Sequence, residues 1–114
     1  MSKDYELYLD NILEAAEKIG RYVSGLSYGD FAGKSLVSDA VIRNLEIIGE
    51  AVKKLPEELK RKHPEIEWKK IAGFRDILAH EYAGVSLRIV WDIVENKLPE
   101  LREKIIQMRK ERNA

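Results

Sequence analysis

The stretch VSDAVIRNLEIIGEAVKKL, residues 37–55, decides the fold of this chain. Its apolar residues recur at steps of three and four, which places them on one face of an α-helix. They are Val37, Val41, Leu45, Ile48, Val52 and Leu55, flanked by Ala40, Ile47 and Ala51. Because the flanking residues widen the apolar face, we expect this helix to lie at the centre of a bundle. Ser38 or Asp39 is expected to cap its start.

The same spacing predicts a helix on each side of this stretch. Residues 5–26 carry one apolar stripe, and Gly29 and Gly33 are expected to end that helix. Residues 64–79 form a third helix, and Gly84 lies just beyond its expected end. With short connections, these helices are expected to pack against one another in alternating directions.

The C-terminal part carries a fourth stripe, from residue 86 to about residue 109, which Pro99 interrupts. Since proline inside a helix removes a backbone hydrogen bond, we expect a kink or a break near Asn96. Residues 57–63, between two prolines, predict a short helical turn and a loop. The predicted fold class is all-α: one domain, residues 1–114, built as an up-down-up-down four-helix bundle with a short extra helical turn and a kinked or broken C-terminal helix.

Composition narrows the classes of function. Twenty basic and twenty acidic residues cancel, so any contact with nucleic acid must be local. The chain has no cysteine, which excludes disulfides and thiolate zinc sites, and we expect no metal or cofactor. No apolar run is long enough for a membrane span or a signal peptide, so we expect a cytoplasmic protein that enters no membrane. At 114 residues, the chain is expected to gain stability from a partner subunit.

One charged residue breaks the apolar pattern of the third helix. At about 100° per residue, Arg75 falls near the middle of the stripe. That stripe consists of Trp68, Ile71, Ala72, Leu78 and Ala79. A guanidinium keeps its charge in such a place, so it requires a carboxylate, a phosphate or water. The ordinary interpretation is that Arg75 pairs with a carboxylate such as Glu50, or extends along the apolar surface to reach water.

His80 follows Arg75 by five residues and points about 140° away from it on a regular helix. Asp76 and His80 lie four residues apart and share a different face. For Arg75 and His80 to hold one phosphate, either the helix ends near His80 and the chain turns the histidine inward, or the arginine and histidine of opposite subunits meet across a symmetry axis. We expect both to contribute. A lone histidine is more often a polar surface residue, which remains the alternative.

The spacing of Arg75, His80 and Tyr82 resembles the Arg-x4-6-His-x-Tyr signature of the HEPN superfamily (higher eukaryotes and prokaryotes nucleotide-binding). Other parts of the chain are similar to the HepT branch of that superfamily. These parts are residues 40–51, Trp68, residues 90–94 and the pair Leu98-Pro99. The likeness covers nearly all of the chain from Ser35 to Leu101.

The resemblance implies a homodimeric four-helix bundle with its active cleft at the dimer interface. It implies a toxin that cleaves RNA without metal. It also implies a partner, a minimal nucleotidyltransferase antitoxin that neutralises the toxin by transferring AMP to Tyr82. Arg75 and His80 would then be catalytic with the help of Asp76, and Arg43 is a candidate for a supporting role together with Glu50.

Those residue types suit metal-independent RNA cleavage. RNA supplies its own nucleophile, the 2′-hydroxyl, so the enzyme needs a base near that group and a cation for the phosphate. His80 is the expected base and Arg75 the expected phosphate-binding group. Asp76, one helical turn before His80, is expected to fix the tautomer of the imidazole.

A second interpretation is a non-catalytic cleft, in which Arg75, His80 and Tyr82 bind a nucleotide or present a substrate to a nucleotidyltransferase. Zero net charge favours it, because RNA enzymes usually carry a basic surface. Against it stands a run of basic residues that could form a local path for phosphates. The run comprises Lys53, Lys54, Lys60, Arg61, Lys62, Lys69 and Lys70. A purely structural dimer ranks third, since it leaves Arg75 without a purpose.

Overall fold

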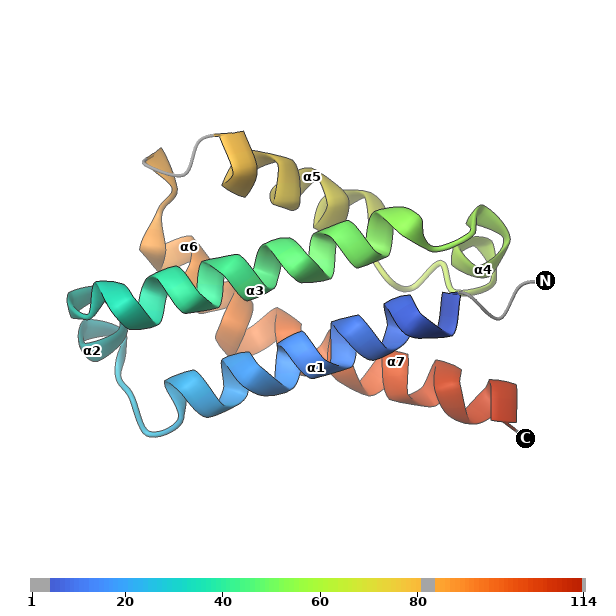
Figure 1. Ribbon diagram of the computed structural model, residues 1–114, viewed down its shortest axis with the longest axis horizontal. Helices are drawn as coiled ribbons and strands as arrows, with labels where there is room; N and C mark the ends of the chain where they lie inside the picture. The colour runs from blue at the N-terminus through green and yellow to red at the C-terminus, as the bar shows by residue number, and fades with distance from the viewer. Residues whose placement is uncertain (1–4, 81–83, 114) are drawn as a thin grey trace.

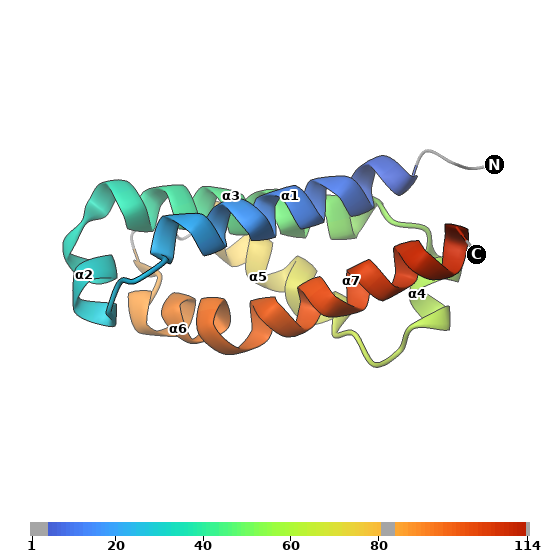
Figure 2. The same ribbon diagram turned by 90° about the horizontal axis from the view of Figure 1, so that it is seen from below.

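The computed structural model describes residues 5–80 and 84–113, and this part of the chain folds into helices without a β-strand. Four long helical stretches run alternately in opposite directions, which confirms the predicted bundle (Figure 1). They are α1 (Tyr5–Val23), α3 (Ser35–Lys54), α5 (Trp68–His80) and the C-terminal stretch that ends in α7 (Leu98–Asn113). Two short helices lie at opposite ends of the bundle, α2 (Tyr28–Gly33) and α4 (Glu57–Lys62) (Figure 2).

The core forms where α1 packs against both α3 and α7, and α3, which lies centrally as its broad apolar face predicts, also packs against α5. Side chains from four elements are fully buried there. They include Ile12 and Ile19 of α1, Val41 and Val52 of α3, Leu78 of α5 and Ile105 of α7. Full burial of one such side chain contributes about 1.5–3 kcal/mol. This apolar core therefore supplies most of the stability and gives α5 a firm surface to pack on.

Helix α1 ends earlier than the sequence predicts. It stops at Val23, and the chain then turns at Gly25, whose φ of 76° suits glycine. A capping box starts α2: Ser27 accepts a hydrogen bond from the backbone of Asp30, and Asp30 accepts one from the backbone of Ser27. The prediction that Gly29 and Gly33 end the first helix is wrong, because both glycines lie within α2.

Two other helix starts differ from expectation. Helix α3 begins at Ser35 with Lys34 as its N-cap and without a side-chain cap, so neither Ser38 nor Asp39 has the capping role predicted for them. The Ser38 hydroxyl instead donates to the carbonyl of Ser35. Helix α5 begins at Trp68 rather than near residue 64. The Trp68 indole N–H contacts the carbonyls of Lys60 and His63, which ties the end of α4 to the start of α5.

The C-terminal stretch contains the irregularity predicted from Pro99. Helix α6 (Leu87–Asp92) starts at a Ser86 cap and continues into a π-helical segment, Ile93–Lys97, before α7. Within that segment the N–H of Leu98 donates to the carbonyl of Ile93, the wider π-type spacing. Since Pro99 has no N–H to donate to the preceding turn, the helix widens there instead of breaking.

Helix α5 packs mainly on α3, at the upper edge of the bundle in Figure 1. One side of α5 therefore meets α3 while its flanks remain accessible. Within residues 5–80 and 84–113, no helix is long and apolar enough to cross a membrane.

Candidate active site on helices α3 and α5

Helices α3 and α5 approach each other closely at Gly49. A Cβ atom built on Gly49 would overlap the Cβ of Arg75 and would lie 2.7 Å from its Cγ. The aliphatic stem of Arg75 thus fills the space that any other residue at position 49 would need. The two helix backbones can come this close only because position 49 is a glycine.

Arg75 lies half-buried against α3, as its place on the apolar stripe predicts, with 24% of its side chain exposed. Its Nη2 donates to Oε2 of Glu50 at 2.8 Å, which confirms the pairing predicted from the sequence. Its Nη1 donates to Oδ1 of Asp76 at 3.3 Å. The Nε atom is buried and has no hydrogen-bond partner within the described part of the chain. The guanidinium is therefore held by its two terminal nitrogens in a fixed orientation.

Asp76 is also held from the neighbouring helix. Its Oδ1 accepts a hydrogen bond from Nζ of Lys53 at 2.5 Å. Lys53 follows Glu50 by three residues on α3, so one face of α3 contributes both an anion and a cation to α5. We call Glu50, Arg75, Asp76 and Lys53 the charged network, because their charges alternate along a chain of contacts.

The contacts of the network shift the pKa values of its members. The hydrogen bond from Arg75 holds the pKa of Glu50 below its ordinary value. The hydrogen bond from Lys53, followed by that from Arg75, lowers the pKa of Asp76. The hydrogen bond to Glu50 raises the pKa of Arg75. Glu50, Arg75 and Asp76 are therefore all charged at neutral pH.

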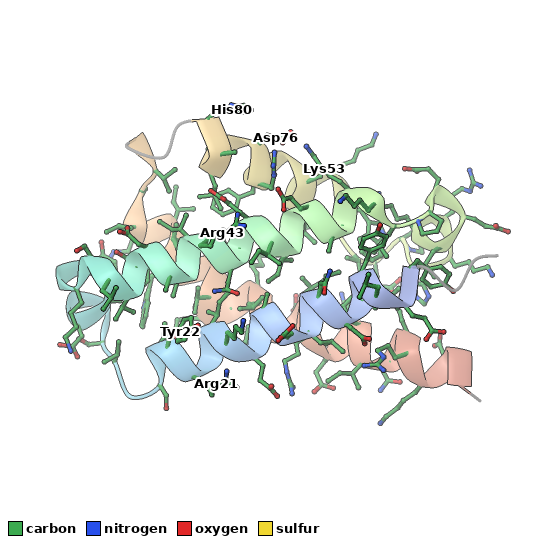
Figure 3. The ribbon with its side chains drawn as sticks, in the orientation of Figure 1. Arg21, Tyr22, Arg43, Lys53, Asp76 and His80 are labelled. Carbon is green, nitrogen blue, oxygen red and sulfur yellow. The ribbon has the colours of Figure 1, made fainter. Side chains whose placement is uncertain are left out.

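His80 ends α5 and is exposed, on the same flank as Asp76 (Figure 3). The expected contact between Asp76 and His80 is absent from the described residues, because Asp76 binds Lys53 and Arg75 instead. A carboxylate gains more from hydrogen bonds to two permanently charged groups than from one to an imidazole. Tyr82 lies outside the described residues. Within a single chain, Arg75 contacts α3 whereas His80 is exposed, so the described contacts do not bring the two side chains together.

Arg43 lies on α3, two turns before Glu50. Its Nη1 contacts Oε1 of Glu46 at 3.3 Å, and 63% of its side chain is exposed. The described contacts do not join Arg43 to Arg75. Glu50 thus contacts the expected catalytic arginine directly, whereas Arg43 does not.

The basic run that precedes the motif is spread over several local pairs. Lys54 lies over the ring of Tyr8, Lys60 pairs with Glu57, and Lys70 pairs with Glu67. Lys53 belongs to the charged network. Nothing in the sequence pattern distinguishes Lys53 from the other lysines. Only the register of α3 against α5 identifies it as part of the site.

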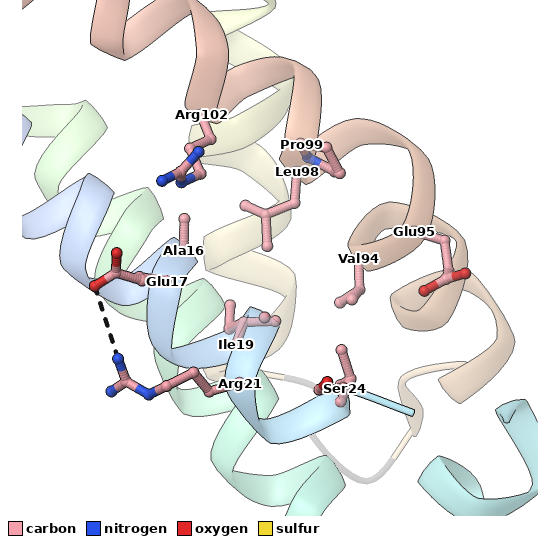
Figure 4. Close-up of a pocket in the computed structure, with 12 residues that line it drawn as sticks. Ala16, Glu17, Ile19, Arg21, Ser24, Val94, Glu95, Leu98, Pro99 and Arg102 are labelled. Atoms are coloured by element: carbon pink, nitrogen blue, oxygen red, sulfur yellow. Dashed lines mark ion pairs between the residues drawn. The ribbon is translucent and has the colours of Figure 1, made fainter. Parts of the chain in front are cut away.

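Two cavities lie away from the charged network. One of about 710 Å³ opens between the end of α1, the π-helical segment and the start of α7, and Figure 4 shows Ile19, Val94 and Leu98 along its wall. Another, of about 500 Å³, lies between α5 and α7 and includes Phe74 and Leu101. Neither is lined by Arg75, Asp76 or His80. No cluster of three or more His, Asp or Glu residues within the described chain is placed to hold a metal ion.

The fold and the site define the class of protein: a helical bundle in which Arg75 is held between α3 and α5 and His80 is exposed at the end of α5. The sequence profile of the family described as Ribonuclease HepT-like matches residues 12–108. The chain belongs to this family, which confirms the resemblance seen in its sequence.

Named relatives agree with that family. "Probable ribonuclease HepT" of Thermococcus cleftensis is 42% identical over 110 residues, which are 96% of this chain and 100% of that protein. A candidate RNase of Caldanaerobacter subterraneus is 46% identical over 98 residues, which are 86% of this chain and 88% of that protein. A Methanocaldococcus jannaschii protein, named as a gamma-glutamylcyclotransferase and candidate RNase, is 43% identical over 111 residues. This chain matches 97% of its own length but only 50% of the length of that last relative. No solved structure matches the chain.

Replacing Gly49 tests the helix contact. In Gly49→Ala the new methyl group overlaps the stem of Arg75, so α3 and α5 must separate. Overpacking of this kind costs about 1–3 kcal/mol. The control is Gly20→Ala in α1, where a Cβ meets nothing within 4 Å. Removing glycine from a helix interior there stabilises by about 0.5–1 kcal/mol. Urea unfolding of the two variants measures both changes, and equal effects would contradict the contact.

Acid unfolding tests the pairing of Glu50. Because the folded-state pKa of Glu50 lies below its ordinary value near 4.5, its stabilising effect is complete above that value and disappears as the pH falls through the folded-state pKa. We expect Glu50→Gln to lower the free energy of unfolding at pH 7 and to make its decline below pH 4.5 shallower. The control is Glu58→Gln on the exposed surface of α4, which should reproduce the parent curve. A Glu50→Gln curve parallel to that of the parent would refute the pairing.

Proposed function

We propose that this protein is an endoribonuclease that cleaves RNA without a metal ion, with Arg75 and His80 as its catalytic residues. The observation that carries the proposal is the anchoring of Arg75: Gly49 accommodates its stem and Glu50 fixes Nη2, so the guanidinium has a set direction at the protein surface. Membership of the Ribonuclease HepT-like family supports it.

The proposed reaction uses the nucleophile that RNA carries. His80 takes the proton of the 2′-hydroxyl as the 2′-oxygen attacks the adjacent phosphorus. Arg75 stabilises the charge that builds on the phosphate oxygens. The bond from phosphorus to the 5′-oxygen breaks, and that oxygen takes a proton from solvent. The products are a 2′,3′-cyclic phosphate and a free 5′-hydroxyl.

The active form in this proposal is a homodimer, in which the arginine of one subunit and the histidine of the other share a phosphate. The separation of Arg75 from His80 on one chain supports it, since symmetric pairing brings two half-sites together. Apolar surface for the contact is exposed on both α3 and α5. Leu36 at the start of α3 is 84% exposed, and Ile77, which adjoins Asp76 on α5, is 48% exposed.

Cleavage of a labelled RNA tests the catalytic roles. We expect His80→Ala to reduce the rate of cleavage at least 100-fold, the usual contribution of a general base, without changing stability, because His80 is exposed. Arg75→Gln should be similarly slow. Coexpression of the two variants forms mixed dimers with one intact pair, and we expect these to recover part of the activity. Equal rates for His80→Ala and the parent would refute the proposal, and mixed dimers without activity would refute shared sites.

We further propose that the protein is the toxin of a toxin–antitoxin pair. The partner is a minimal nucleotidyltransferase that transfers AMP from ATP to the hydroxyl of Tyr82 and releases pyrophosphate. The family resemblance supports this step. An adenylyl group at Tyr82 would add negative charge and bulk close to the motif and compete for Arg75.

The intact mass of the protein coexpressed with its genomic neighbour tests the modification. We expect an increase by the mass of one or more adenylyl groups, lost in Tyr82→Phe. The modified protein should also fail to cleave RNA. A mass that stays unchanged, or an increase that survives Tyr82→Phe, would contradict the proposal.

One observation favours the alternative of a nucleotide-binding subunit that presents a substrate to a nucleotidyltransferase. The twenty basic and twenty acidic residues of the chain cancel, whereas RNA enzymes usually carry a basic surface that follows the backbone. Parent protein that binds nucleotide but leaves RNA intact in the cleavage assay would establish this alternative.

A further inference from the structure

The carboxylate of Asp76 lies between two cations. A single oxygen, Oδ1, accepts from the ammonium of Lys53 at 2.5 Å and from Nη1 of Arg75 at 3.3 Å. The two cations come from different helices and converge on this one oxygen. An ammonium and a guanidinium that share an oxygen form the arrangement in which proteins bind phosphate.

The two carboxylates around Arg75 are held differently. Glu50 binds Nη2 at 2.8 Å and lies on the rigid central helix beside Gly49. Asp76 binds Nη1 at the longer distance of 3.3 Å. A ligand would therefore exchange more readily with Asp76 than with Glu50, and Arg75 would keep its anchor while Nη1 changed partner.

Solvent exposure favours the same exchange. The side chains of Asp76 and Lys53 are 47% and 41% exposed, whereas that of Arg75 is 24% exposed. A carboxylate so exposed can rotate into water with little desolvation cost, since it leaves no buried charge behind. Lys53 and Nη1 of Arg75 would then face an incoming anion together.

We propose that Lys53 and Nη1 of Arg75 form a binding cradle for a backbone phosphate of RNA, and that Asp76 fills this cradle in the free protein until the phosphate displaces it. The inference rests on the proposed function for the identity of the ligand. It makes Lys53 a substrate-binding residue and Asp76 an internal competitor of the substrate. With all four residues in place the charged network is neutral, so displacement of Asp76 uncovers one net positive charge.

Binding measured without cleavage tests the cradle. The probe is a fluorescent 2′-O-methyl oligoribonucleotide, which has an RNA backbone but lacks the attacking hydroxyl, and its anisotropy reports Kd. We expect Asp76→Asn to lower Kd several-fold, because the amide competes less well for the two cations. Lys53→Ala should raise Kd and reduce the slope of log Kd against log salt by about 1, the change for one lost phosphate contact. Lys53→Arg should keep most of the affinity.

The matched control is Lys110→Ala on α7, which removes the same charge from an exposed position outside the network and should leave the salt slope unchanged. Thermal unfolding of every variant separates binding from folding. The cradle is refuted if Asp76→Asn leaves Kd unchanged or raises it, if Lys53→Ala keeps the parent slope, or if the parent does not bind the probe. Cleavage is scored separately, so probe binding with these shifts by a protein that leaves RNA intact would support the cradle and reject the ribonuclease proposal.

Discussion

The contact between Gly49 and Arg75 sets the position of the charged network. Helix α5 packs mainly on α3, and it comes close because position 49 has no side chain. At that distance the side chains of Glu50 and Lys53 reach Arg75 and Asp76 directly. A wider spacing would leave water between these groups, and the arginine would lose its fixed direction.

Magnitudes separate what stabilises the fold from what orients the site. Ion pairs between exposed side chains contribute roughly 0–1 kcal/mol each, and both members of the Lys53–Asp76 pair are more than 40% exposed. A single fully buried side chain such as Ile12 or Leu78 contributes about 1.5–3 kcal/mol. The fold therefore depends on the apolar core. The exposed Lys53–Asp76 pair can therefore open without unfolding the protein, which is the property that a binding site requires.

Sequence patterns predicted the parts of this structure that depend on neighbours along the chain. The spacing of apolar residues located α3, and the angle of Arg75 on its helix predicted burial and a partner such as Glu50. The contact of Lys53 with Asp76 was not predicted, because the two residues lie 23 positions apart and only the register between two helices brings them together. Asp76 does share a flank with His80, yet helical spacing gives no means of ranking an imidazole against two cations from elsewhere. The predicted end of the first helix was wrong for a different, local reason, since Gly25 and Ser27 end α1 and begin α2 within a few residues.

The zero net charge of the chain is an argument against an RNA substrate. The charged network weakens that argument. The net charge of the chain counts the negative charge of Asp76 as if it always opposed phosphate binding. In the structure this carboxylate lies exposed between two cations on the surface of the bundle. Its charge offsets theirs only while it stays there, so the field near Arg75 depends on the position of one side chain. A protein without net charge can still attract a phosphate at one place on its surface. Over a few ångströms the attraction depends on the nearest charged groups, because the charges of distant groups are screened by salt.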